Sequence, residues 1–205
     1  MTTLSALEED ALTEVFNLGL SRAATQLSEL LQDRIDIDIP RIRIVSYEDV
    51  AEALELNANQ PVAGVAQEMG GYIHGAAMLV FPSEEAHALV KALIGSIPTL
   101  ETEDLRKFEH EAMSEIGNII ISSAISTISD MLAGEVQLST PDYAEDTIAN
   151  LLSANSAGLL PEEIRVIVMR ANLKAFERKV SGSLVMLLSL DFIEKLLRSL
   201  GLSEG

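Results

Sequence analysis

Two long stretches of this chain carry apolar residues at the spacing of an amphipathic helix. In residues 5–31 the apolar positions fall on one side of a helical wheel, namely Leu12, Phe16, Leu20, Ala23, Leu27 and Leu30. In residues 103–132 they cover more of the circumference, namely Phe108, Ala112, Ile116, Ile119, Ile120, Ile125 and Ile128. Both stretches are predicted to be helices, and the second is expected to be the more buried.

Other segments alternate between apolar and polar residues, which is typical of β-strands. Residues 35–39 alternate strictly, and the alternation resumes after Pro40 one position out of register. A proline at such a change of phase predicts a bulge or a sheet edge, where its missing N–H is tolerated. Residues 62–68 and 72–81 are predicted to form a hairpin through Gly70 and Gly71.

The remaining elements repeat this order in the second half of the chain. Short helices are predicted at residues 46–54 (capped by Ser46), 83–95, 144–153 and 191–200, and strands near Val136 and Leu138 and at 164–173 and 180–188. A charged linker is expected at 96–104 and a loop at 153–161. Each half therefore reads helix, strand, helix, two strands, helix, which predicts an α/β (α+β) fold with an antiparallel sheet.

A polar motif occurs once in each of these halves. The two sets are Asp10, Glu14, Asn17, Pro40 and Glu111, Glu115, Asn118, Pro141, each residue standing 101 positions after its counterpart. By chance, roughly one acidic start in ten thousand would show this pattern. We therefore predict that residues 1–205 form one domain with a pseudo-twofold axis, made of two internal repeats at about 5–95 and 103–201.

The helical period gives the motif a chemical meaning. Positions i, i+4 and i+7 lie within a stripe about 60° wide, so Asp10, Glu14 and Asn17 point the same way. In the first helix this stripe lies opposite the apolar side, so it is expected to face solvent or a partner.

Composition excludes several classes of protein. With 205 residues and 48% hydrophobic content, the chain can bury a full core. Its net charge of −18 would repel nucleic acids and anionic membranes. Cysteine is absent from the sequence, no apolar run approaches the roughly 20 residues of a membrane span, and the first ten residues do not resemble a secretory signal. We expect a cytoplasmic protein without nucleic-acid binding or membrane insertion.

Familiar catalytic or metal-binding patterns do not emerge from the sequence. The histidines His74, His87 and His110 are widely spaced, without the i, i+4 pair that metal sites on helices use. Each is expected on the surface or in a structural role, and we predict neither a metal nor a cofactor bound by this chain.

The repeated motif resembles that of the CheC, CheX and FliY chemotaxis phosphatases, and most of all CheC, where it is present twice. The run Glu115-Ile116-Gly117-Asn118 is also similar to the family's Glu-Ile-Gly-Asn. There are departures: Glu111 stands where the family has Asp or Ser, and Phe16 stands where it has Gly. The run Ile119-Ile120-Ile121 replaces small residues and is expected to crowd a partner beside Asn118, whereas Gly19 is expected to leave room beside Asn17.

The resemblance implies a hydrolase that removes the aspartyl phosphate of a CheY-like response regulator, a receiver domain. Asn17 and Asn118 would then orient the attacking water, while Glu14 and Glu115 would pair with a lysine of the receiver. Asp10 and Glu111 would support orientation, and Pro40 and Pro141 would shape the adjacent strand. Mg²⁺ is expected in the receiver and not in this chain.

Two other functions fit the same motif. A non-catalytic module could bind a receiver, or the receptor deamidase CheD, through the same stripes. A flagellar-switch component like FliY is expected less, because the sequence ends at Gly205 without a further switch-binding domain. The Gly19 and triple-isoleucine arguments, together with Asp10, which keeps the family's acidic residue where Glu111 is longer, predict that the first site is the more active. Phe16, where the family has Gly, argues the other way.

Overall fold

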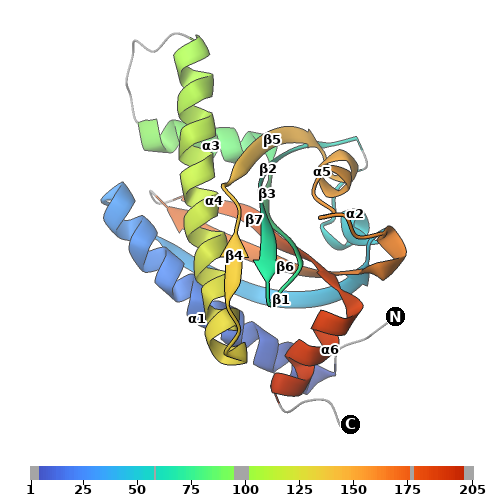
Figure 1. The fold of residues 1–205 in the computed structure, drawn as a ribbon. Coiled ribbons are helices and arrows are strands. Elements are labelled where there is room, and N and C mark those ends of the chain that lie inside the picture. The colour runs from blue at the N-terminus through green and yellow to red at the C-terminus, as the bar shows by residue number, and fades with distance from the viewer. Residues whose placement is uncertain (1–4, 58, 95–101, 176–177, 201–205) are drawn as a thin grey trace.

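The computed structural model describes residues 5–57, 59–94, 102–175 and 178–200 (Figure 1). Its elements, in chain order, are α1 (Ala6–Leu31), β1 (Asp36–Ser46), α2 (Val50–Ala53), β2 (Pro61–Gly71), β3 (Gly75–Pro82), α3 (Ser83–Ile94), α4 (Thr102–Leu132), β4 (Val136–Leu138), β5 (Asp142–Thr147), α5 (Ile148–Ala154), a 3₁₀ turn at Pro161–Glu163, β6 (Ile164–Ala175), β7 (Arg178–Ser189) and α6 (Leu190–Ser199).

The strands form one antiparallel sheet in the order β1-β6-β7-β3-β2-β4, with β5 also pairing with β2. The predicted mixed fold with an antiparallel sheet is confirmed, including the hairpins β2–β3 and β6–β7. The first strand of each half pairs with the other half: β1 pairs with β6, and β4 and β5 pair with β2. The strand order is therefore the same, read in reverse, when the two halves are exchanged. Descent of the two halves from one duplicated unit stays a prediction.

Helices cover both faces of the sheet, so its central strands are buried on both sides (Figure 1). The larger core lies under α1, α3, α4 and α6, and the smaller core lies under α2 and α5. Successive residues of β2 serve the two cores alternately: Val65 packs into the larger one and Ala66 into the smaller one. The motif-bearing helices α1 and α4 thus share one face of the sheet.

The two long helices pack as their apolar patterns predict, with one exception in each: Phe108 of α4 is 39% exposed. Leu12, Phe16 and Leu20 of α1 are fully buried, but Leu30 is 52% exposed, so its assignment to the core side is wrong. In this last turn Leu31, four residues after the buried Leu27, packs against the core in its place. In α4, buried residues run through most of Met113 to Ile128, which confirms that it is the more buried helix.

The predicted bulge at Pro40 is confirmed. The pairing of β1 with β6 shifts between Asp38 and Arg41, so Ile39 and Pro40 fall outside the regular ladder. Pro40 itself is exposed.

Three boundaries differ from the sequence-based expectations. Ser46 ends β1 and its hydroxyl donates to Asp49 at 2.6 Å, so it does not cap the single-turn helix α2. The β2–β3 hairpin does not turn at Gly70 and Gly71, which belong to β2; its loop is residues 72–74, so Tyr72 lies in the loop and not in β3. Residues 144–147 extend strand β5, and α5 begins only after Thr147, whose hydroxyl accepts the N–H of Asn150. Most of the predicted linker at 96–104 lies outside the described residues.

Candidate functional site

The first polar stripe lies on the outer side of α1, beside the bulge of β1. Asp10 and Glu14 are exposed and Asn17 is half-buried. The Asn17 Oδ1 accepts the backbone N–H of Ile39 at 2.9 Å, and its Nδ2 donates to the Ile39 carbonyl at 3.5 Å. Asn17 therefore takes up backbone groups that the bulge removes from the strand ladder. This contact gives a physical reason for the fixed distance between the asparagine and the proline in the motif.

The second stripe lies on α4 and is anchored differently. Glu111 and Glu115 are exposed and Asn118 is half-buried. The Asn118 Oδ1 accepts a hydrogen bond from Gln67 Nε2 at 3.3 Å. The same Nε2 donates to the carbonyl of Ser139 at 2.7 Å, in the break between β4 and β5 that precedes Pro141. Here a side chain of β2 stands between the asparagine and the interrupted strand.

These contacts restrict what each amide can do. In both stripes the amide oxygen already accepts one hydrogen bond from the protein, while the amide nitrogen retains at least one N–H for another acceptor. One turn earlier, Glu14 and Glu115 present exposed carboxylates suited to a cation of a partner. The stripes offer recognition and hydrogen bonding, so a reactive group would have to come from the partner.

The steric expectations beside the stripes are wrong. Ile119, Ile120 and Ile121 are at most 9% exposed, so they pack inward and cannot crowd a partner. Gly19 is buried where α1 meets α4, and a Cβ there would lie 2.9 Å from the Ser123 carbonyl oxygen. Its small size serves helix packing and leaves no space beside Asn17. The exposed neighbour of Asn17 is Leu18, with 56% of its surface accessible.

The glycine of the Glu-Ile-Gly-Asn run has a packing role as well. A Cβ on Gly117 would approach the side chain of Val65 to between 2.4 and 2.9 Å. Helix α4 therefore lies directly on β2 at the position next to Asn118. At the corresponding position of α1, Phe16 is fully buried in the larger core. There α1 packs through a large side chain, whereas α4 packs through a glycine.

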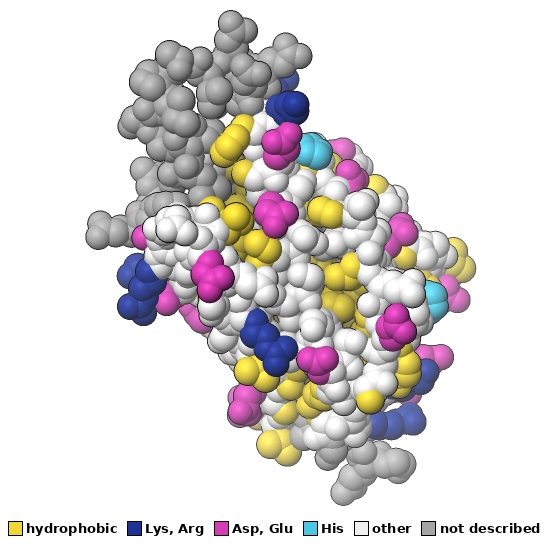
Figure 2. Space-filling model, turned by 60° about the vertical axis from the view of Figure 1, so that its left-hand side comes forward, with side chains coloured by type: hydrophobic (Ala, Val, Ile, Leu, Met, Phe, Trp, Pro, Cys, Tyr) yellow, Lys and Arg dark blue, Asp and Glu magenta, His cyan; other side chains and the backbone are white. Residues whose placement is uncertain are grey.

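Acidic side chains are spread over the surface that these helices share. Figure 2 shows Asp and Glu side chains scattered across this face with few Lys or Arg, and apolar patches between them. The chain as a whole carries 32 acidic and 14 basic residues. A partner with a basic contact surface is favoured by this distribution.

A separate cluster could hold a cation. His87 Nε2 lies 3.1 Å from an oxygen of Glu109 and 3.1 Å from one of Glu145, and the Tyr143 hydroxyl donates to the same carboxylates. Burial and the two carboxylates raise the pKa of Tyr143, so the phenol stays protonated. Sequence spacing did not reveal this cluster because its members come from α3, α4 and β5. It contains none of the motif residues.

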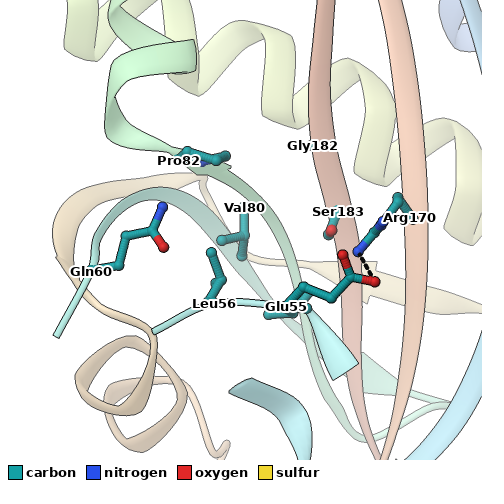
Figure 3. A pocket seen from close by; sticks show the side chains of 9 residues that line it. Glu55, Leu56, Gln60, Val80, Pro82, Arg170, Gly182 and Ser183 are labelled. Atoms are coloured by element: carbon teal, nitrogen blue, oxygen red, sulfur yellow. Dashed lines mark ion pairs between the residues drawn. The ribbon is translucent and has the colours of Figure 1, made fainter. Parts of the chain in front are cut away.

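The other face of the sheet has a cavity of about 220 Å³ between β3, β7 and the segment after α2 (Figure 3). Leu56, Gln60 and Val80 line it, and Arg170 forms an ion pair with Glu55 at its edge, at 2.9 Å. Since this cavity belongs to the side covered by α2 and α5, it is not part of either polar stripe.

Within the described part of the chain, no helix combines the length and the apolar character needed to cross a bilayer.

Both stripes lie in segments that are similar to a known family. A model of the CheC-like family matches residues 7–44 and 108–143, which contain both complete motifs with their prolines. In these two segments the chain is similar to the CheC-like family. The CheY-P phosphatase CheC of Bacillus subtilis is 26% identical over 198 residues, covering 95% of this chain and 94% of that protein.

Solved structures share the fold of this chain. The crystal structure of Thermotoga maritima FliY has a TM-score of 0.73 at 21% identity, covering 98% of both chains. CheX in the complex of CheX with CheY, beryllium trifluoride and Mg²⁺ from Borrelia burgdorferi has a TM-score of 0.51 at 14% identity, covering 86% of this chain and 97% of that one.

Proposed function

We propose that this chain is a phosphatase that hydrolyses the aspartyl phosphate of a CheY-like receiver domain, using two sites on α1 and α4. The observation that carries the proposal is the repeated arrangement of an exposed glutamate one helical turn before an anchored asparagine amide. The similarity to a CheY-P phosphatase over nearly the whole chain supports the same activity.

The reaction divides the work between the two proteins. The receiver would supply the phosphorylated aspartate, a bound Mg²⁺ and a lysine. Water attacks the phosphorus, the bond between phosphorus and the aspartyl oxygen breaks, and the products are free carboxylate and inorganic phosphate, which takes up a water proton. This chain would supply the amide of Asn17 or Asn118 to hold that water in line.

An anchored amide suits this role for two reasons. Its oxygen is fixed by Ile39 in one site and Gln67 in the other, so the direction of the remaining N–H is set before the partner arrives. An amide also stays neutral throughout the reaction, so it positions the water without taking up its proton. The expected rate increase comes from holding the attacking water in line with the phosphorus, a placement that a free water molecule lacks.

The remaining motif residues would serve recognition and support. Glu14 and Glu115 would pair with the receiver lysine, a charge-assisted contact that fixes the register of the complex. Asp10 and Glu111, one turn earlier, would add to the orientation of the partner. Pro40 and Pro141 would keep the strand interrupted beside each asparagine. Receiver phosphorylation is a cytoplasmic process, so the proposal includes a cytoplasmic location.

Catalysis and binding can be separated by stoichiometry. Purified phospho-receiver with Mg²⁺ is mixed with this chain at one-fiftieth of its concentration, and phosphate release is followed over time. A phosphatase releases many phosphates per chain and accelerates the whole decay. A module that only binds receivers or CheD changes at most the small bound fraction, and that result would replace catalysis by binding as the function.

A further inference from the structure

Gln67 is a polar side chain in an apolar layer. It lies in the middle of β2 and is 2% exposed, and Val65 and Met69, its neighbours on the same face of the strand, belong to the larger core. Buried positions of this kind normally carry apolar residues. Its amide is aimed at Asn118 of α4 and at the carbonyl of Ser139.

This side chain is not arranged for greatest stability. Its Nε2 makes both hydrogen bonds, at 3.3 Å to Asn118 and 2.7 Å to Ser139, while its buried Oε1 has no partner among the described residues. Burying an acceptor without a donor lowers the stability of the folded state. A methionine of similar length would avoid that cost but would give up both hydrogen bonds. In return, Gln67 connects Asn118 of α4 to the strand break at Ser139.

The first site has no such residue. Ile37 pairs with Leu173 on β6 as Leu138 pairs with Met69 on β2, so the position on β6 that corresponds to Gln67 is Ala171. The methyl group of Ala171 cannot donate a hydrogen bond to an amide. In the first site the backbone N–H of Ile39 donates to Asn17 instead. Anchoring by a side chain is thus specific to the second site.

We propose that Gln67 is a positioning residue for Asn118. By donating to Oδ1 it fixes which end of the Asn118 amide faces the helix surface, so that the N–H groups of Nδ2 point to the incoming partner. Because the Oδ1 contact selects between two orientations of the amide, its loss would leave Asn118 in place but misdirected. This inference rests on the proposed phosphatase function for its kinetic consequence, but not for its structural one.

The kinetic test isolates the two sites in one chain. Glu14→Ala weakens docking at the first site, so that turnover in this chain comes mainly from the second, and Glu115→Ala does the reverse. Gln67→Met is then added to each. In the Glu14→Ala chain we expect kcat to fall about tenfold with KM within about twofold. In the Glu115→Ala chain kcat should stay within about twofold, which controls for damage to the fold. Equal losses in both chains, or no loss in the first, would overturn the proposal.

The structural test needs no receiver. The side-chain amide signal of Asn118 is assigned by NMR from its disappearance in Asn118→Asp, and its shift is compared between the native chain and Gln67→Met. We expect the Asn118 signal to move and that of Asn17 to stay. An unmoved Asn118 signal would refute the positioning role. If the Asn118 signal moves but the native chain releases no phosphate, the contact between Gln67 and Asn118 is supported and the phosphatase proposal is refuted.

Discussion

At the scale of single residues, the two asparagines of the motif are alike in sequence and unlike in attachment. Asn17 binds both backbone groups of Ile39, a buried residue within the bulge of β1. Asn118 is bound by the side chain of Gln67, which has a second and shorter hydrogen bond to Ser139. The first asparagine therefore supports the fold as well as the site.

This difference predicts unequal effects on stability. Asn17→Ala leaves the N–H of Ile39 without its acceptor and should lower the free energy of unfolding by about 1–3 kcal/mol. Asn118→Ala removes one long hydrogen bond and should cost about 1 kcal/mol or less. Urea unfolding followed by circular dichroism measures both. Equal losses would mean that the bulge does not depend on Asn17.

Leu18 gives the first site a feature that the second lacks. It is 56% exposed beside Asn17, whereas the corresponding Ile119 is 9% exposed. The prediction that the first site is the more active has lost its steric arguments, since Gly19 and the three isoleucines are buried in the packing of the helices. An exposed leucine that a receiver can cover is a new reason to favour it, beside the shorter acidic side chain of Asp10.

Leu18→Ser should therefore weaken receiver binding at the first site. Covering a leucine contributes about 1.5–3 kcal/mol at most, so we expect KM to rise between about threefold and tenfold in the Glu115→Ala chain, with kcat little changed. Leu160→Ser, on a distant loop and equally exposed at 55%, is the matched control. If both substitutions leave KM the same, the apolar contact does not exist.

At the scale of elements, the placement of the second site depends on how closely α4 approaches the sheet. Gly117 allows this approach because the side chain of Val65 occupies the space where a Cβ would lie. Asn118 is the next residue, so a shift of the helix there would carry the amide away from Gln67.

Gly117→Ala should destabilise the protein by about 1–3 kcal/mol through overpacking, although alanine is the better helix former. Val65→Ala should restore part of that loss in the double variant, because it removes the atoms in the way. Thermal unfolding of the four chains gives the coupling between the two positions. A Gly117→Ala chain more stable than the native one would contradict the close contact.

Some elements could be predicted from sequence because one periodic pattern covers each of them. The long helices, the two hairpins and the bulge at Pro40 are of this kind. Strand β5 could not, because Glu145 and Asp146 are both exposed and break the alternation of a strand. Thr147 caps the helix that follows directly, so the strand and the helix were predicted as one helix. Gln67 and the cluster around His87 depend on contacts between elements distant in sequence, which no local pattern records.

At the scale of the whole molecule, charge and topology set how a partner arrives. The net charge of −18 attracts a basic surface, and the range of this attraction decreases as the salt concentration rises. The two sites flank opposite ends of the sheet, one beside β1 and the other beside β4, so each can be tested alone. The long-range attraction is shared by both sites, and the contacts of Glu14 and Glu115 are local.

Replacing both glutamates tests the local contribution. Glu14→Gln with Glu115→Gln should weaken receiver association and make the remaining binding less sensitive to salt, because one charged contact per site is removed at constant size. Titrations at two ionic strengths measure both effects. Glu8→Gln with Glu162→Gln changes the net charge equally outside the motif and serves as the control. The contact of these carboxylates with a receiver cation is refuted if affinity is unchanged at both ionic strengths.

The most direct test of the central claim is the rate of phosphate release from a saturating phospho-receiver by Asn17→Ala with Asn118→Ala. It is measured at a temperature where circular dichroism shows the double variant to be folded. If the two amides hold the attacking water, nearly all stimulated release is lost while the receiver still binds. A folded double variant that releases phosphate as fast as the native chain would show that catalysis does not depend on these asparagines.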